Sequence, residues 1–169
     1  MNYGIALGSN LGDRLWHLQE AVRRLLNAHF SMRLLAAAPV YDTAPVDCPE
    51  GSQSFYNTVV EISCNLAPLE LLRDMRAIEA AMGRPNEHAH HAPRTVDLDM
   101  LYADALTLET PELTLPHPRI TQRCFVLQPL ADIRPDLVLP GNELPIQEHL
   151  ECLQSDEPPL EMVTREWVV

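Results

Sequence analysis

The stretch Pro93–Tyr102, PRTVDLDMLY, sets two carboxylates into a run of apolar and β-branched residues that is typical of a strand. Because residues i and i+2 of a strand face the same side, Asp97 and Asp99 share one face of the predicted sheet, roughly 6.5 to 7 Å apart at their backbones. The plain interpretation is that each aspartate caps a loop or pairs with an arginine such as Arg94. Two adjacent carboxylates otherwise repel each other, whereas a divalent cation turns this cost into coordination energy, and hard oxygen ligands favour magnesium or manganese. With an arginine-led loop before it and an arginine and histidine cluster after it, the stretch predicts a metal and phosphate site.

The segments around this stretch predict an alternation of strands and helices. Apolar runs ended by turn residues predict strands, and apolar residues at three- and four-residue steps predict helices. The predicted order is a strand at 3–8, a helix over about 11–29, strands at 32–41 and 55–66, a helix at 68–83 and the strand at 95–102. This order matches the split βαβ core of ferredoxin-like folds, an α+β class in which an antiparallel sheet carries its helices on one face. Shorter helices are predicted around 123–133 and 146–153, and the polar loops 42–54 and 84–94 are predicted to be mobile active-site loops.

Length and composition limit the architecture and the location. The 169 residues suit one domain, 1–169, in which the acidic C-terminal extension 148–169 carries little recognisable pattern. No apolar run approaches the roughly twenty residues of a membrane span, and the N-terminus lacks the basic segment of a secretory signal, so we expect a cytoplasmic protein. A formal charge of −12 disfavours nucleic acid and anionic membranes as partners. We expect a monomer or a weak homo-oligomer, and Trp167 in the extension either packs back on the chain or makes a subunit contact.

The basic residues are all arginines, 12 in number, and the chain contains no lysine. The absence of lysine excludes Schiff-base chemistry and the phosphate-binding lysine of a P-loop. Arginine, with its planar fork of donors, is then the permanently charged side chain that can bind phosphate. The 4 cysteines form no CxxC pair, so neither a zinc ribbon nor a dithiol redox site is predicted.

The segment 90–101, HHAPRTVDLDML, resembles the signature of the 6-hydroxymethyl-7,8-dihydropterin pyrophosphokinase family. That signature runs basic, any, small, Pro-like, Arg, two free positions, Asp-aliphatic-Asp and two aliphatics, and every constrained position fits. Further motifs follow in the family's order: Gly8-Ser9-Asn10, Phe55-Tyr56-Asn57, Gly83-Arg84, and Pro116-His117 with Arg123-Cys124-Phe125. The similarity covers about residues 3–145, and a long pattern with ordered satellites is a specific signal.

The resemblance implies transfer of pyrophosphate from ATP to the 6-hydroxymethyl group of the dihydropterin, with release of AMP, in folate biosynthesis. It implies two magnesium ions held by Asp97 and Asp99, and it implies that Arg84 and Arg94 are catalytic residues that grip the phosphates from a mobile lid. ATP is the co-substrate, and the residues implied to contact it are Arg76, Glu79, Met100, Thr114, His117 and Arg123. The residues implied to contact the pterin are Thr43, Pro45, Val46, Phe55, Asn57 and Phe125, and the two phenylalanines would stack on the flat ring.

The chain departs from the family pattern in and near the lid. Asn86 and Glu87 stand where basic residues are common, His91 stands where tryptophan is common, and Glu112 replaces an expected arginine. These changes weaken the electrostatics of the lid. They leave two other hypotheses, namely a non-catalytic pterin-binding or regulatory paralogue, and a kinase for a related hydroxymethyl heterocycle.

The lid also contains an HxHH pattern formed by His88, His90 and His91. Imidazoles suit zinc and nickel, so this pattern could bind such a metal, although a run of this kind in a polar loop is usually solvated. Alternatively, the histidines gain charge below about pH 6.5 and replace the missing cations on the triphosphate.

Overall fold

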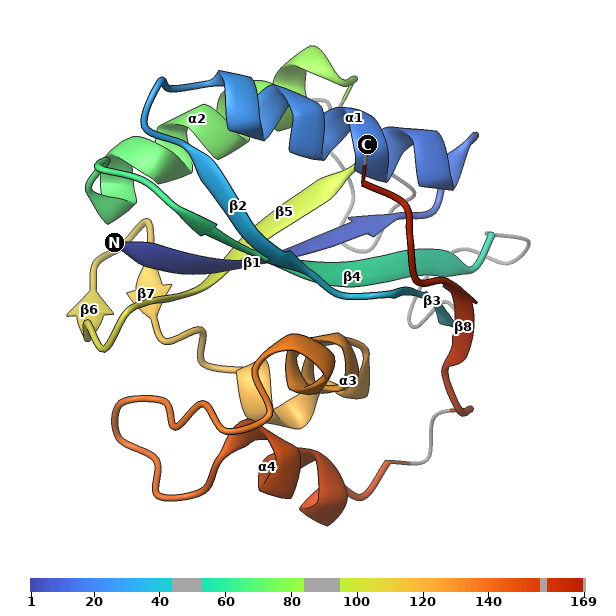
Figure 1. Ribbon diagram of the computed structural model, residues 1–169, viewed down its shortest axis with the longest axis vertical. Coiled ribbons are helices and arrows are strands. Elements are labelled where there is room, and N and C mark those ends of the chain that lie inside the picture. The colour runs from blue at the N-terminus through green and yellow to red at the C-terminus, as the bar shows by residue number, and fades with distance from the viewer. Residues whose placement is uncertain (44–52, 84–94, 156–157, 169) are drawn as a thin grey trace.

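The computed structural model describes residues 1–43, 53–83, 95–155 and 158–168, and its centre is a six-stranded sheet (Figure 1). The spatial order is β5-β1-β4-β3-β8, and β2 pairs with the remaining part of β4 on the side where β3 lies. Every neighbouring pair is antiparallel. The strands of the sheet are β1 (Asn2–Ser9), β2 (Arg33–Ala37), β3 (Val40–Thr43), β4 (Phe55–Ser63), β5 (Asp97–Ala103) and β8 (Glu161–Thr164). A separate small hairpin follows β5 and consists of β6 (Leu108–Glu109) and β7 (Thr114–Leu115).

Helices cover both faces of the sheet (Figure 1). The helices are α1 (Arg14–Asn27) and α2 (Pro68–Ala81) on one face, and η1 (Ile120–Gln122), α3 (Cys124–Ile133) and α4 (Ile146–Cys152) on the other. Local sequence sets two of the helix starts. The Asp13 carboxylate accepts a hydrogen bond from the N–H of Trp16 at 3.1 Å, which caps α1. Pro68 begins α2, where a missing backbone N–H does no harm.

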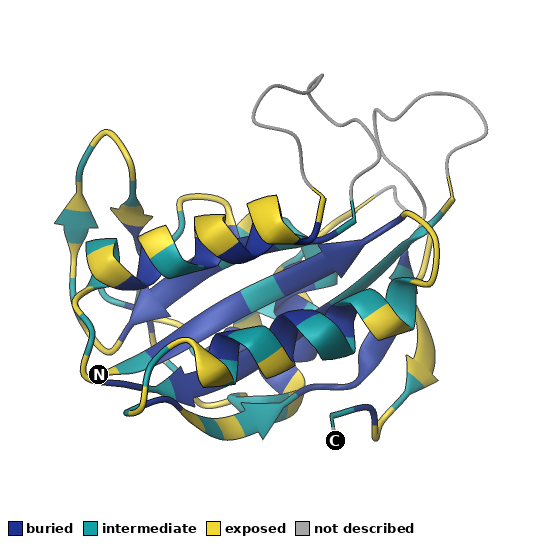
Figure 2. Cartoon of the chain, turned by 90° about the horizontal axis from the view of Figure 1, so that it is seen from above, coloured by how far each residue is buried: buried dark blue, intermediate teal, exposed yellow. Residues whose placement is uncertain are grey.

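Alternation along the strands gives each face of the sheet its own apolar core. On β1, Tyr3, Ile5 and Leu7 pack into the core beneath α1 and α2, whereas Ala6 packs against the core beneath α3. Figure 2 shows the consequence for α1 and α2, whose inner surfaces are buried on the sheet and whose outer surfaces are exposed. By the same alternation Gly4 and Gly8 face α3, so the central strand presents only small residues on that side.

The ferredoxin-like α+β core that the sequence predicts is present, with both long helices and the antiparallel sheet. The two long helices lie on one face, as this core implies, whereas α3 and α4, for which the sequence predicted no face, pack beneath the opposite face around a second apolar cluster. The start of α1 is also later than predicted, at Arg14, because Gly12 adopts a positive φ of 64° and Asp13 caps the helix.

The predicted strand at 32–41 is two strands, β2 and β3, separated at Ala38 and Pro39. Pro39 has no N–H to give to a sheet ladder, which favours a break at this point. The buried Thr58 hydroxyl lies 3.0 Å from the carbonyl oxygens of both Ala38 and Pro39 and can donate to either. The break lets one chain segment pair with β4 at two different places.

The C-terminal segment packs back on the chain through Trp167, which is one of the two outcomes that the sequence left open. Its side chain is buried, and the indole N–H donates to the Ala38 carbonyl at 2.8 Å. The Gln19 amide of α1 donates to the Trp167 carbonyl, also at 2.8 Å, and β8 pairs with β3. Residues 161–168 therefore extend the sheet and then return to α1.

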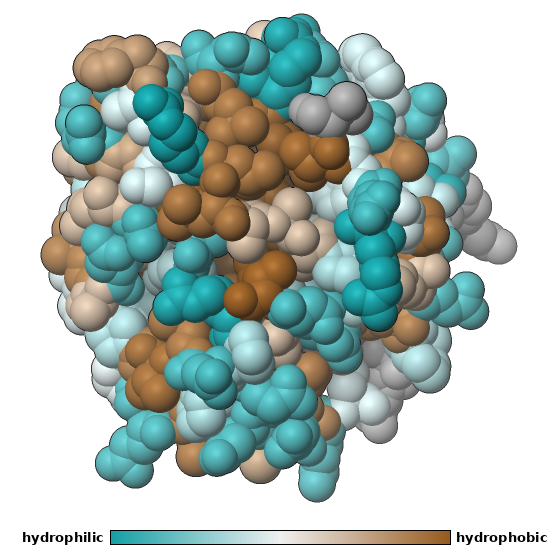
Figure 3. All heavy atoms as spheres, viewed as in Figure 1, coloured by the Kyte–Doolittle hydropathy of each residue, from teal (hydrophilic) through white to brown (hydrophobic). Residues whose placement is uncertain are grey.

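The surface has apolar areas outside the cores. Figure 3 shows apolar side chains gathered on the side of the molecule where β2 lies in the foreground. Exposed large apolar residues include Leu35 on β2 and Met162 and Val163 on β8. In the described part of the chain, no helix is both long enough and apolar enough to cross a membrane. The expected monomer or weak homo-oligomer stays a prediction.

Candidate active site

The acidic pair lies at the start of β5, on the face of the sheet that α3 covers. Leu98 and Met100 are buried in the core beneath α1 and α2, so Asp97 and Asp99 must face the opposite side. Asp97 lies opposite Gly8 of β1, and Asp99 lies opposite Ala6. The predicted shared face of the two carboxylates is therefore confirmed, and the neighbouring strand offers only small residues beside them.

Gly8 lies between the acidic pair and a second group of polar residues. It pairs with Asp97 on β5 and with Asn57 on β4, so these three residues form one row across the sheet. A Cβ added at Gly8 would lie 2.7 Å from Oδ1 of Asn57, which is closer than atoms tolerate. A larger residue at position 8 would therefore displace the Asn57 amide, which occupies the space above the central strand.

The backbone between the two aspartates is held by side chains of α2. The N–H of Leu98 donates to Oε2 of Glu79 at 2.9 Å, and Nη1 of Arg76 donates to the Leu98 carbonyl at 3.0 Å. Arg76 and Glu79 also pair with each other at 2.5 Å, and Glu79 is buried. Because β5 is the outermost strand on this side of the described sheet, the two side chains bind the Leu98 backbone as a neighbouring strand would, and they fix the residue between Asp97 and Asp99.

Electrostatics at the acidic pair favour added positive charge. Burial raises the pKa of Asp99 to about 7, the negative charges of Asp97 and Glu79 add to this, and the charges of Arg76 and Arg123 oppose it. Burial also raises the pKa of Glu79, although its hydrogen bond from Leu98 and its pairing with Arg76 work in the opposite direction. The described surroundings of Asp99 thus leave its ionised form unfavourable.

The imidazole of His117 and the guanidinium of Arg123 approach the acidic pair from the segment after β7. The N–H of His117 donates to the Leu101 carbonyl at 2.8 Å, which ties this segment to β5. Nδ1 of His117 accepts from the N–H of Arg119 at 3.1 Å, which leaves the proton of the neutral ring on Nε2. Burial lowers the pKa of His117, and the charges of Arg123 and Arg119 lower it further. Arg123 sits at the start of α3 with its guanidinium 5.7 Å from the Phe125 ring centre.

Three of the residues predicted to contact pterin, Thr43, Phe55 and Asn57, lie where β3 and β4 meet. Thr43 and Phe55 are paired across the two strands. Nδ2 of Asn57 donates to Oγ1 of Thr43 at 2.7 Å, so the amide is held in one orientation. Phe55 and Asn57 alternate with Tyr56, which packs against the core beneath α1 and α2, and they therefore face the same side of the sheet as the acidic pair. Phe125 approaches this side from α3 and packs against its core.

The structure gives fewer contacts for the other residues that were predicted to belong to the site. The backbone of Met100 is two residues beyond Leu98 and points to the same outer edge of β5. Thr114 is exposed on β7, and Glu112 is exposed in the turn before it. The predictions for Pro45, Val46, Arg84, Arg94, Asn86, Glu87, His88, His90 and His91 lie outside the described residues.

Sequence reasoning missed how the site is supported. It placed Glu79 and Arg76 near the nucleotide but gave no sign that they bind the Leu98 backbone, because a contact between a side chain and a distant backbone has no sequence pattern. Within the described ranges, no three His, Cys, Asp or Glu side chains cluster into a complete metal site. A metal at Asp97 and Asp99 would therefore take further ligands from substrate or water, as magnesium in phosphate sites often does.

The acidic pair, with Arg76 and Arg123 near it, is the arrangement expected of an enzyme that transfers phosphate groups. The family model for 7,8-dihydro-6-hydroxymethylpterin-pyrophosphokinase matches residues 4–135, and the chain belongs to this family. It is 44% identical over 129 residues to the 2-amino-4-hydroxy-6-hydroxymethyldihydropteridine pyrophosphokinase of Bacillus subtilis, covering 76% of this chain and 75% of that protein. The enzyme of the same name from Pseudomonas aeruginosa is 41% identical over 145 residues, covering 83% and 86%.

Solved structures agree on the fold. The chain is similar to Plasmodium falciparum HPPK-DHPS crystallised with pteroate, with a TM-score of 0.69 at 16% identity over 89% of this chain. It spans 42% of that longer chain, and it spans 20% of the folic acid synthesis protein fol1 of Schizosaccharomyces pombe, with which it shares 36% identity. The additional parts of those longer proteins have no counterpart in these 169 residues.

Proposed function

We infer that this chain transfers pyrophosphate from ATP to the hydroxymethyl group of 6-hydroxymethyl-7,8-dihydropterin and releases AMP, as a step of folate biosynthesis. In this reaction the hydroxymethyl oxygen attacks the β-phosphorus of ATP, and the bond between that phosphorus and the oxygen bridging it to the α-phosphate breaks. The hydroxyl proton is lost, and AMP leaves. The observation that carries the proposal is the shared orientation of Asp97 and Asp99 within the family's signature.

Magnesium fits the acidic pair, and we propose two ions there. Asp97 and Asp99 supply hard oxygen ligands from one face of β5, and the raised pKa of Asp99 marks a position where added positive charge lowers the free energy. When bound, the ions would neutralise charge that develops on the phosphate oxygens. Glu79 and Arg76 hold the peptide between the two aspartates and so set the spacing of the carboxylates.

The side chains beside the pair suit the nucleotide. Arg123 carries a permanent charge near Asp99, and the neutral His117 ring offers its Nε2 proton as a donor to a phosphate or ribose oxygen. The outward edge of β5 at Met100 offers backbone donor and acceptor groups to a planar base. Arg84 and Arg94 keep the catalytic role that the family resemblance implies, and Thr114 keeps its nucleotide contact; these roles stay predictions.

The pterin ring would lie over the small residues of β1, on the side where Asn57 is held. Phe55 approaches from β4 and Phe125 from α3, so a flat ring can stack between an aromatic of the sheet and one of the helix. The Asn57 amide, fixed by Thr43, supplies one donor and one acceptor for the ring edge. Pro45 and Val46 stay predicted backbone contacts.

The test is AMP formation by the purified chain with ATP, magnesium and 6-hydroxymethyl-7,8-dihydropterin. We expect stoichiometric AMP and pterin pyrophosphate, and no AMP when the pterin is omitted. Pterin binding without AMP formation would instead support a binding protein, and AMP formation only with another hydroxymethyl heterocycle would reassign the acceptor. Either result would overturn the proposal.

A further inference from the structure

Arg14, the first residue of α1, holds the chain on both sides of Phe55. Its Nη1 donates to the Ser54 carbonyl at 2.7 Å and to the Ser54 hydroxyl at 2.9 Å. Its guanidinium carbon lies 3.9 Å from the centre of the Tyr56 ring, within the range of a cation–π contact. A charged donor strengthens the two hydrogen bonds, so Ser54 and Tyr56 are both tied to the start of α1.

These contacts lie on the face of the sheet opposite to the site. Tyr56 packs against the core beneath α1 and α2, whereas Phe55 faces the other side, where its ring comes within 3.8 Å of a Cβ built at Gly8. In an extended chain, the residues on both sides of a given residue point the opposite way. When Ser54 and Tyr56 are held on the face beneath α1 and α2, the direction of Phe55 on the opposite face, where the site lies, is therefore fixed as well.

The start of α1 is itself well anchored, which makes Arg14 a firm support. Asp13 caps the helix, and the buried residues Leu18, Val22 and Leu25 hold it on the sheet. By contrast, Ser54 lies just before β4, and Phe55, the first residue of β4, is paired with Thr43 of β3 but lies beyond the end of the pairing with β1. The contact thus transfers the rigidity of the helix to the end of the strand.

We propose that Arg14 is a positioning residue for the pterin, acting through Phe55. This inference rests on the proposed function, which assigns the Phe55 ring to the pterin. Arg14 does not touch the substrate; it restricts Phe55 to the direction in which the ring can stack. Loss of Arg14 weakens pterin binding and leaves the nucleotide side of the site, on β5 and α3, unchanged.

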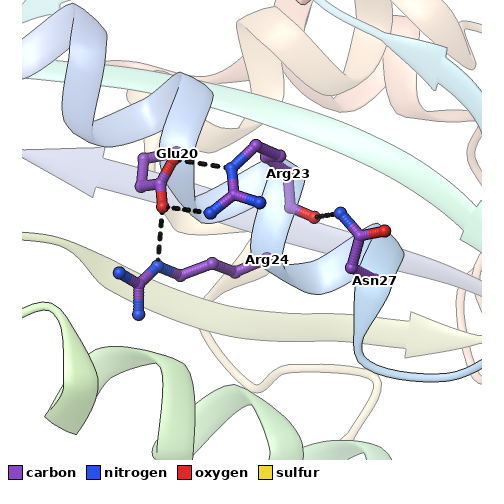
Figure 4. A network of polar contacts seen from close by, with 4 residues as sticks. All are labelled: Glu20, Arg23, Arg24 and Asn27. Atoms are coloured by element: carbon purple, nitrogen blue, oxygen red, sulfur yellow. Dashed lines mark hydrogen bonds and ion pairs between the residues drawn. The ribbon is translucent and has the colours of Figure 1, made fainter.

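The test compares steady-state constants of R14Q with those of the wild type for both substrates. We expect the KM for the pterin to rise about tenfold, because a small misplacement of a stacking group is costly, while kcat and the KM for ATP stay within about twofold. The matched control is R24Q on the same helix, where Arg24 pairs with Glu20 at 2.9 Å on the outer surface (Figure 4). R24Q should leave all three constants within about twofold of the wild type.

A second variant separates positioning from general loss of structure. S54A removes the hydroxyl acceptor but keeps the carbonyl contact, so it should raise the pterin KM in the same direction by a smaller factor. Circular dichroism and thermal unfolding check that each variant is folded, and if R14Q is not, S54A and R14K, which keeps the charge without the fork of donors, decide the question. An unchanged pterin KM, or an equal rise in both KM values, overturns the inference. Failure of the proposed function differs from both, because the wild type would then form no AMP.

Discussion

Two acidic sites lie on the same face of the sheet, and their surroundings differ: one holds the single carboxylate Glu61 with its partners, and the other holds Asp97 and Asp99. Glu61 on β4 is buried, and it receives hydrogen bonds from Tyr102 and, at 2.5 Å, from Nη1 of Arg134. On β5, Asp99 keeps a pKa raised to about 7 beside the like charge of Asp97. The first carboxylate is matched by a cation of the fold, whereas the second remains unfavourable when ionised.

We interpret the difference as one between a structural carboxylate and the proposed metal site. A buried carboxylate that serves the fold is neutralised by its own ion pair, and breaking that pair destabilises the protein. A pair of carboxylates that serves an enzyme is left with repulsion that a substrate complex can relieve, at the expense of stability in the free protein. Substitutions in the two acidic sites should therefore change different measured quantities.

The largest effect is expected from the double variant D97N/D99N. AMP formation should fall by about a thousandfold or more, because the oxygen ligands for the cation are lost together. The free energy of unfolding without magnesium should not fall, since repulsion is removed. Turnover and urea titration measure the two quantities. Retained magnesium-dependent turnover would remove the acidic pair from the chemistry.

The opposite pattern is expected for R134M, which leaves Glu61 buried without its cation. The free energy of unfolding should fall by about 2 kcal/mol, because Glu61 is buried whereas the Arg134 side chain is 37% exposed and interacts partly with solvent. The turnover of the folded fraction should stay within about twofold of the wild type. E61Q/R134M, which removes both charges and keeps an acceptor for the Tyr102 hydroxyl, is the control and should recover much of the stability. A specific loss of ATP affinity in R134M would show that the two acidic sites are not separate.

A pH series sharpens the comparison at Asp99. The carboxyl has an ordinary pKa of 3.8 and a pKa of about 7 in the folded protein, so the folded state binds this proton more tightly than the unfolded chain. Its stabilising contribution is present below about pH 4 and is lost as the pH rises to about 7. Relative to the wild type without magnesium, D99N should therefore gain about 2 kcal/mol between pH 5 and pH 8. Parallel stability profiles for the two proteins would contradict this expectation.

The smallest effect is expected at Glu79, which links the fold to the site. In E79Q the amide oxygen can still accept the Leu98 N–H, but the amide nitrogen meets Arg76 in place of a carboxylate oxygen. We expect a loss of about 1 kcal/mol in unfolding free energy and a rise of about threefold in the magnesium concentration for half-maximal rate. E79L, which leaves the N–H without its acceptor, should exceed E79Q in both. Equal behaviour of the two variants would show that this hydrogen bond is unimportant.

Patterns local to one segment were predictable from the sequence. The periodicity of α1 and α2, the turn after β1 and the alternation of β5 give the core of the fold, and residue spacing alone places Asp97 and Asp99 on one face. The family signature adds the reaction. Each of these features depends only on residues that are close in the sequence, and the periodicity of apolar residues reflects such local relations.

Contacts between distant segments were not predictable in the same way. Arg14 binds Ser54 across 40 positions, and Glu79 binds the Leu98 backbone across 19. β8 is only four residues long and largely exposed, so it has little apolar pattern to find. The helices on the second face were found as segments, but their side of the sheet depends on packing that spacing does not encode.

The contact of Arg76 and Glu79 with Leu98 also bears on aggregation. An outermost strand with free N–H and C=O groups is a template for strands of other molecules, and proteins commonly shield such edges with charge or cover. A further strand along β5 would achieve this, but it would close the edge at Met100 to the nucleotide that we propose binds there. In the described part of the chain, an ion pair on a helix shields this edge at Leu98, so sheet growth is opposed at that residue without a strand that would cover Met100.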